Sequence, residues 1–95
     1  MSSIITFPNS GNVAVLVQGV VDRAVVASLV RDVRHVFRQI IGRWSVSVRP
    51  CSTGRGRWRL ELRGGAGRHV WSFAATTTRL PDMVLEKVKE FLRGF

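Results

Sequence analysis

The chain has 95 residues, of which 45% are hydrophobic, and a formal net charge of +9 at pH 7. A chain of this length forms one domain with one modest core, and it is too short to add a deep catalytic cleft between lobes. The hydrophobic fraction excludes a disordered basic tail, which would lack the apolar side chains needed to offset the entropy of ordering the chain. We therefore expect a compact domain with one layer of sheet and one layer of helices.

The excess of basic residues favours polyanionic partners. Fifteen Lys and Arg stand against six Asp and Glu, and long-range attraction and counterion release draw such a protein to polyanions. DNA and RNA are the first candidates, followed by an anionic membrane surface and an acidic protein. Apart from Lys87 and Lys89, all the basic residues are arginine. A GC-rich genome produces such an arginine bias without selection for binding, so a solvated basic surface stays open as the alternative.

Cysteine content and hydropathy place the chain among proteins without disulfides or membrane spans. Cys51 is the single cysteine, so no disulfide can form within the chain, and no secretory leader pattern opens the sequence. The longest apolar run, residues 13–17, is too short to cross a bilayer. We expect a cytoplasmic protein with a flexible N-terminal segment over residues 1–12 and a single α+β domain over residues 13–95.

Residues 13–18 are rich in β-branched side chains and are expected to form a short strand that ends near Gly19. One continuous helix from this point to residue 41 would place Val13, Leu16 and Val17 opposite the apolar stripe of the later residues. We therefore expect a break between the two elements. Whether this strand joins the sheet stays open at the level of sequence.

A helix is predicted over residues 22–41, with Asp22 capping its first turn and Gly42 following its last apolar residue. Arg31, Arg34 and Arg38 are three and four residues apart, so they share one edge of this helix. Its apolar stripe consists of Val25, Leu29, Val33, Val36, Phe37, Ile40 and Ile41.

Three strands are predicted over residues 43–49, 57–63 and 68–74, joined by a long loop and by a glycine-rich hairpin. Their side chains alternate between large apolar residues and mostly basic or small polar ones, which assigns them to two opposite faces. The core face is expected to carry Trp44, Val46, Val48, Trp58, Leu60, Leu62, His69, Trp71 and Phe73. The other face is expected to carry Arg43, Ser45, Ser47, Arg49, Arg57, Arg59, Glu61, Arg63, Arg68, Val70 and Ser72.

The last predicted element is a helix that Pro81 opens at its first turn, with Asp82 near the positive end of the helix dipole and Gly94 at its end. The element order, (β)-α-β-β-β-α, predicts an α+β fold. We expect a three- to four-stranded, mainly antiparallel sheet with both helices packed on one face.

The order of helix, three strands and helix resembles that of the double-stranded-RNA-binding domain over residues 22–93. That family binds RNA largely through a lysine-rich start of its last helix. Here this place holds Leu80-Pro81-Asp82-Met83-Val84, with an acid and no lysine. Because a shared order of elements does not transfer a function, we infer no membership of that family.

Arginine is concentrated in residues 43–68, where Glu61 is the one acid. Guanidinium groups donate paired hydrogen bonds to phosphate oxygens and keep their charge at every accessible pH. No aromatic residue is expected on the basic face, so backbone binding without strong sequence preference is the predicted mode. The predicted polyanion-binding residues are Arg49, Arg55, Arg57, Arg59, Arg63 and Arg68, with a second patch at Arg31, Arg34 and Arg38 on the opposite side of the domain.

Residues with catalytic or metal-binding chemistry are few and scattered. Cys51, His35 and His69 lack the spacing of a zinc site, and His69 is expected to be a core histidine beside Trp71. The six acids form no evident acid and base pair. We predict a protein that is not an enzyme and has no catalytic residue, cofactor or metal, and we infer no small-molecule substrate.

A protein-interaction or self-association module is the rival hypothesis. Val70, Ser72 and Ala74 make the outer side of the last strand only weakly polar. Such a surface suits docking onto a protein partner or onto a second copy of the chain.

Overall fold

The computed structural model of the chain describes residues 4–7, 13–38, 40, 42–52, 55–65 and 67–94. These residues form five strands, two α-helices and one 3₁₀ turn. In chain order the elements are β1 (Ile4–Phe7), β2 (Val13–Gln18), α1 (Arg23–Phe37), β3 (Trp44–Pro50), β4 (Arg57–Gly64), β5 (Gly67–Ala74), the 3₁₀ turn Thr77–Arg79 and α2 (Leu80–Arg93).

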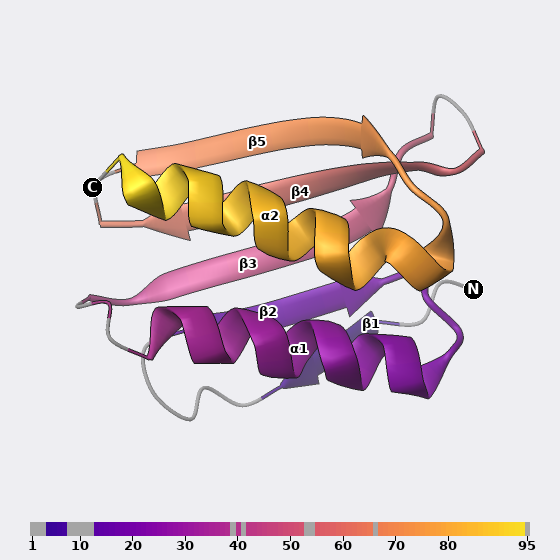
Figure 1. Cartoon of the computed structure of the whole chain (residues 1–95), viewed down its shortest axis with the longest axis horizontal. Coiled ribbons are helices and arrows are strands. Elements are labelled where there is room, and N and C mark those ends of the chain that lie inside the picture. Colours follow the sequence, from indigo (N-terminus) through magenta and orange to yellow (C-terminus); the bar gives the residue numbers. More distant parts are fainter. Residues whose placement is uncertain are drawn as a thin grey trace.

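The strands form one mixed sheet in the order β1-β2-β3-β4-β5, and both helices pack against the same face of it (Figure 1). β2 and β3 are parallel because α1 carries the chain back across the sheet between them. The other neighbouring strands are antiparallel. The predicted α+β class, with a mainly antiparallel sheet and two helices on one face, is confirmed.

β1 is a strand that the sequence analysis did not predict, because it lies within the segment expected to be flexible. It pairs antiparallel with β2, with Ile5 opposite Val17 and Phe7 opposite Val15. Its four residues are all β-branched or aromatic, and it pairs with backbone groups that β2 would otherwise expose at a sheet edge. β2 is therefore an internal strand. The rest of the predicted segment, residues 1–3 and 8–12, lies outside the described residues.

α1 begins where the sequence predicts but ends earlier. The Asp22 carboxylate caps the helix, with Oδ1 accepting a hydrogen bond of 2.9 Å from the Ala24 N–H. The helix ends at Phe37 rather than at residue 41, because the next N–H bonds to the carbonyl of His35, three residues back, and tightens the last turn. Ile40 still packs against the core from the connection to β3, and residues 39 and 41 lie outside the described residues.

α2 follows its predicted bounds closely. Pro81 lies in the first turn together with Asp82, and Gly94 ends the helix. Before it, the Thr76 hydroxyl accepts a hydrogen bond from the Arg79 N–H and so caps the 3₁₀ turn. No helix within the described ranges combines the length and the apolar character that crossing a membrane requires.

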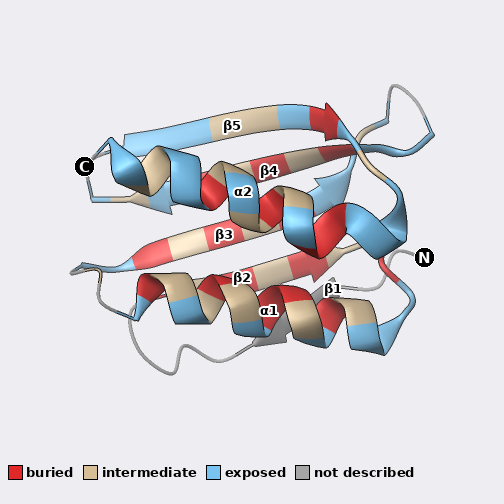
Figure 2. Ribbon diagram, in the orientation of Figure 1, coloured by how far each residue is buried: buried red, intermediate tan, exposed pale blue. Residues whose placement is uncertain are grey.

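The core lies between the sheet and the helices, and no described polar or charged residue is buried in it. Buried and partly covered positions alternate along β2, β3 and β4, as Figure 2 shows. The predicted inward residues of β3 and β4 are all buried: Trp44, Val46, Val48, Trp58, Leu60 and Leu62. β2 and the helices add Val13, Val15, Val17, Val26, Leu29, Val30, Val33, Phe37, Leu80, Val84 and Val88.

β5 departs from the alternating pattern because it is an edge strand. Phe73 is buried, whereas Trp71 is half-buried and His69 is exposed. The prediction that His69 is a buried core histidine is therefore wrong. Its ring lies against those of Trp71 and Phe91, with centroid distances of 4.3 Å and 5.4 Å, at the open side of the core where no further described strand covers it.

Candidate polyanion interface

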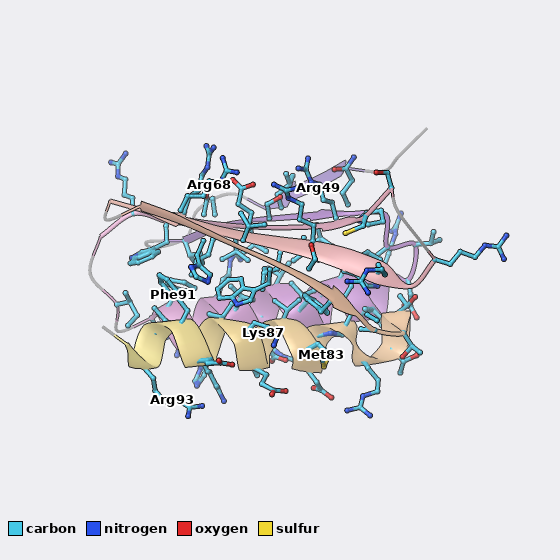
Figure 3. The ribbon with its side chains drawn as sticks, turned by 90° about the horizontal axis from the view of Figure 1, so that it is seen from above. Arg49, Arg68, Met83, Lys87, Phe91 and Arg93 are labelled. Carbon is cyan, nitrogen blue, oxygen red and sulfur yellow. The ribbon has the colours of Figure 1, made fainter. Side chains whose placement is uncertain are left out.

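The sheet face turned away from α1 and α2, called the outer face here, is not covered by any described element. Figure 3 shows Arg49 and Arg68 projecting from this side of the sheet, opposite α2. The strand register places five of the six predicted arginines on this face. Glu61 is the one described acid among them. The arginines are Arg49 of β3, Arg57, Arg59 and Arg63 of β4, and Arg68 of β5.

Strand pairing arranges four of these arginines in two opposed pairs, one toward each end of the outer face. In the first pair, Arg49 lies directly across from Arg59. The Cys51 N–H donates a backbone hydrogen bond of 2.9 Å to the Arg57 carbonyl, which shows that these two residues occupy a hydrogen-bonded position between β3 and β4. By alternation, Arg49 and Arg59 occupy a hydrogen-bonded position, where opposed Cα atoms are about 5.5 Å apart. Like charges held directly opposite each other repel.

The second pair, Arg63 and Arg68, contacts Glu61. The Nε of Arg63 lies 2.8 Å from Oε2 of Glu61, and the Nε of Arg68 lies 3.7 Å from the same oxygen. The Glu61 side chain is only 19% exposed, whereas those of Arg63 and Arg68 are 61% and 51% exposed. One carboxylate therefore compensates part of the charge of two arginines at this end of the face.

The other end has no such compensation. Arg49, Arg57 and Arg59 form no ion pair with any described carboxylate. The side chains of Arg49 and Arg59 line a half-open pocket of about 430 Å³ on the outer face. Its other lining residues are Pro50, Cys51, Ser52 and Ser72, so no acid contributes to its wall.

The Arg59 side chain, which lines this pocket, contains one nitrogen that is not hydrogen-bonded to any described residue. Its Nε is buried and has no hydrogen-bond partner among the described residues. Buried polar atoms in folded proteins are nearly always hydrogen-bonded, and leaving one unsatisfied costs about 1–3 kcal/mol. The site therefore lacks an acceptor at this position.

A smaller pocket lies at the Glu61 end of the sheet. It has a volume of about 230 Å³ and is lined by Arg43, Trp44, Ser45, Arg63 and Gly64. Two arginines line it, as in the first pocket, but here Arg63 is bound to Glu61. The two pockets thus differ in charge compensation more than in the type of residue that forms them.

A glycine supports a ring beside each pocket. A Cβ added to Gly19, whose φ is +80°, would lie 2.7 Å from the ring carbons of Pro50. A Cβ added to Gly64 would lie 2.5 Å from the ring of Trp44. Both distances are too short for any side chain, so Pro50 and Trp44 take these positions because glycine leaves room for them.

The remaining predicted arginines do not join the two pairs. Arg55 is exposed in the turn before β4. Of the predicted second patch, Arg31 and Arg34 lie on α1 and Arg38 is its C-cap residue, so the patch belongs to the layer on the opposite side of the sheet from the outer face. Arg31 is also engaged locally, since it bonds to the Ser28 hydroxyl and lies 3.5 Å from the carboxylate of the next residue.

The candidate metal-binding residues are not brought together. His35 is exposed on α1, His69 is exposed on β5, and Cys51 lines the larger outer pocket. Within the part of the chain that the structure describes, no group of three His, Cys, Asp or Glu side chains could hold a metal ion.

The alternation in the sequence predicted that the arginines share one face, but not that this face has two unlike ends. One partial signal was available: alternation along the strand places Glu61 on the same side as Arg59 and Arg63, each two residues away, but does not show which of them it pairs with. The pairing of Arg49 with Arg59 had no such signal, because the register of β3 against β4 is set across the loop that joins them.

Protein-family models, curated proteins and solved structures were all compared with the chain, and none matches it. The fold and the site define a small α+β domain with an uncovered, arginine-rich sheet face.

Proposed function

We propose that this protein binds the phosphate backbone of nucleic acid, or a polyanion of similar charge density, through its outer face. The observation that carries the proposal is the gathering of five arginines and a single glutamate on one sheet face that no described element covers. Arginine suits this role because its guanidinium donates two parallel hydrogen bonds to phosphate oxygens and is always charged.

The spacing of the arginines along β4 supports contact with a phosphate chain. Arg57 and Arg59 are two residues apart and Arg59 and Arg63 are four apart, which correspond to about 7 Å and 13 Å along an extended strand. Each strand of duplex DNA carries one phosphate for about every 3.4 Å of the helix axis. A nucleic-acid strand that runs along β4 therefore brings a phosphate within reach of each of these arginines.

The outer face suits backbone contact rather than base reading. None of the side chains that the register of β2 to β5 places on it is aromatic, so the described face lacks the stacking platform with which sheets bind unpaired bases. Phosphate contacts position a protein on nucleic acid without reading its sequence. We therefore expect similar affinities for duplexes of different sequence.

Fluorescence anisotropy with labelled DNA and RNA duplexes tests the proposal. We expect micromolar or tighter binding at about 50 mM salt and a steep loss by about 200 mM, because each phosphate contact adds about one to the slope of log affinity against log salt. The variant Arg57→Gln/Arg59→Gln should weaken binding and lower that slope by about two. The matched control, Arg31→Gln/Arg38→Gln, removes the same charge from the helix side and should weaken binding less.

Two results would contradict the proposal. One is the absence of salt-sensitive binding to either duplex. The other is a helix-side control that weakens binding as much as the sheet variant, because overall charge and not the outer face would then determine the affinity. Thermal unfolding of both variants verifies that each retains the fold.

A second candidate function is self-association through the edge strand β5. The Ala75 N–H bonds to the Gly56 carbonyl over 2.8 Å and continues the ladder between β4 and β5. By alternation, the backbone groups of Val70, Ser72 and Ala74 point away from β4. β5 also contains neither proline nor lysine, the residues that commonly protect an exposed edge. A second copy that pairs its own β5 here would extend the sheet.

Sedimentation analysis over a range of protein concentrations tests this candidate. A dimer that dissociates in the variant Val70→Lys would support it, because a charged side chain on an edge strand opposes strand addition. A monomer at every concentration would contradict it, and so would a dimer that Val70→Lys leaves intact.

A further inference from the structure

We infer that Arg49 and Arg59 form a binding site for one phosphate group, called the seat here, in the larger outer pocket. Pro50, Cys51, Ser52 and Ser72 complete the lining of this pocket. This inference rests on the proposed function of the outer face and adds a discrete site to it. The seat binds a phosphate group in a defined place, whereas the other arginines attract the polyanion by charge.

The first support is the opposed arrangement of the two arginines. Arg49 and Arg59 are direct partners across β3 and β4, and no described carboxylate pairs with either. Their mutual repulsion is relieved when an anion lies between them. Each guanidinium can donate two hydrogen bonds to such an anion, so a single phosphate can occupy both forks.

The second support is the unsatisfied Nε of Arg59. This atom is buried and no described atom accepts its proton. Because the atom is covered in this structure, we expect the Arg59 side chain to turn outward when an anion binds, and the anion then supplies the missing acceptor. Nε and a terminal nitrogen of the same guanidinium form the paired donors that match two phosphate oxygens. Phosphate binding therefore converts an unfavourable buried donor into a charge-assisted hydrogen bond.

The third support comes from the rest of the pocket lining. Ser72 is the direct partner of Arg59 on β5, in a non-hydrogen-bonded position where opposed Cα atoms are about 4.5 Å apart. Ser52 and Ser72 are exposed, and their hydroxyls are additional donors for phosphate oxygens. The smaller pocket is a weaker candidate, because its Arg63 is already bound to Glu61.

The backbone that carries Arg49 is also held in place. Pro50 follows it and its ring rests against Gly19, while the next N–H, of Cys51, bonds to the carbonyl of Arg57. A site whose backbone is fixed before binding loses less entropy when the ligand arrives. This support distinguishes the seat from an arginine on a mobile loop.

NMR of the arginine Nε–H signals tests the seat directly. The isotope-labelled protein is titrated with inorganic phosphate, while chloride keeps the ionic strength constant. We expect saturable shifts for Arg59 and Arg49, and small linear shifts for Arg63 and Arg68. Linear shifts of similar size for all four signals would overturn the inference.

A pair of lysine variants tests the geometry of the seat. Arg59→Lys keeps the positive charge but removes the planar fork, and we expect it to weaken phosphate binding about tenfold or more. The matched control Arg63→Lys makes the same change at the other end and should alter phosphate affinity by less than about twofold. Equal effects of the two variants would show that charge alone attracts the anion and would contradict the seat.

Two further ligands identify the source of the phosphate and separate this inference from the proposed function. Saturable shifts of the Arg59 signal with a nucleoside monophosphate and with duplex DNA would show that the seat takes phosphate groups from either. Saturation by inorganic phosphate without any duplex binding would support the seat and contradict the proposed function. Salt-sensitive duplex binding without saturation by phosphate would contradict the seat and support the proposed function.

Discussion

The two ends of the outer face have the same components and differ in charge. Each has an opposed pair of arginines, a shallow pocket and a ring that rests on a glycine. At one end Glu61 pairs with Arg63 and Arg68, whereas no described carboxylate pairs with Arg49 or Arg59 at the other. The same residue type is therefore partly neutralised at one end and available to a ligand at the other.

The position of Glu61 alone does not explain this difference, since it is two residues from both Arg59 and Arg63 along β4. Its diagonal neighbours are Arg49 on β3 and Arg68 on β5. Glu61 faces β5 in a non-hydrogen-bonded position, and opposed Cα atoms there are about 1 Å closer than in the hydrogen-bonded position that faces β3. Of these two cross-strand neighbours, Arg68 is thus the closer to Glu61, and it draws the carboxylate toward Arg63, which makes the shorter contact with it.

The largest effect is a loss of stability, expected when the glycine that leaves room for the Trp44 ring is replaced. Gly64→Ala places a methyl group against the ring of Trp44, which is buried and packs against Phe37 and Phe91. Overpacking of this kind costs about 1–3 kcal/mol, and chemical denaturation measures the loss. Gly65→Ala is the control, because no atom lies within 4 Å of the added carbon. Equal stability of the two variants would show that the ring moves aside freely.

A moderate effect is expected when the charge difference between the ends is removed. Glu61→Gln leaves Arg63 and Arg68 uncompensated, so both become available to phosphates. We expect duplex affinity at low salt to rise about fivefold, which corresponds to the energy of one close charge interaction near a solvated surface.

The control for this change is Glu86→Gln, which removes an exposed acid from α2 and leaves the outer face unchanged. Anisotropy titrations compare the two variants. A similar gain in both would contradict the local compensation by Glu61, because net charge alone would then account for the affinity.

The smallest effect is expected on phosphate binding at Arg49 and Arg59, when Glu61 loses its contact with Arg68. Arg68→Gln removes the cross-strand arginine that draws Glu61 toward Arg63, so the carboxylate spends part of its time close to Arg59 instead. Phosphate binding at Arg49 and Arg59 should weaken about twofold, in keeping with the small energies of exposed ion pairs. Phosphate titration by NMR measures this change. An unchanged affinity would show that Glu61 remains with Arg63 regardless of Arg68.

Alternation along β3 and β4 predicted correctly which residues point inward and which arginines point outward, because it depends only on the local backbone. Trp58, Leu60 and Leu62 are buried, and their arginine neighbours lie on the outer face. The prediction for His69 failed although its face was correct, since burial at that position requires a strand beyond β5. The pattern in a strand therefore determines a face but not the depth of burial.

Other features of the fold depend on pairing between strands that are distant in the sequence, which local patterns do not reveal. β1 is stabilised by pairing with β2, and the parallel register of β2 with β3 comes from the passage of α1 between them. The arginine face itself could be predicted from residues 57–63. Its division into a compensated and an uncompensated end could not, because this depends on which residues of β3 and β5 lie opposite β4.

The sequence by itself determined the direction of the strand side chains, and with it the existence of a basic face, because a period of two is a local property of extended backbone. Only the tertiary structure decided that Arg49 meets Arg59 and that Glu61 meets Arg63 and Arg68. Arg49 and Arg68 lie on strands that loops join to β4, and packing of the whole sheet against α1 and α2 sets the register of these strands.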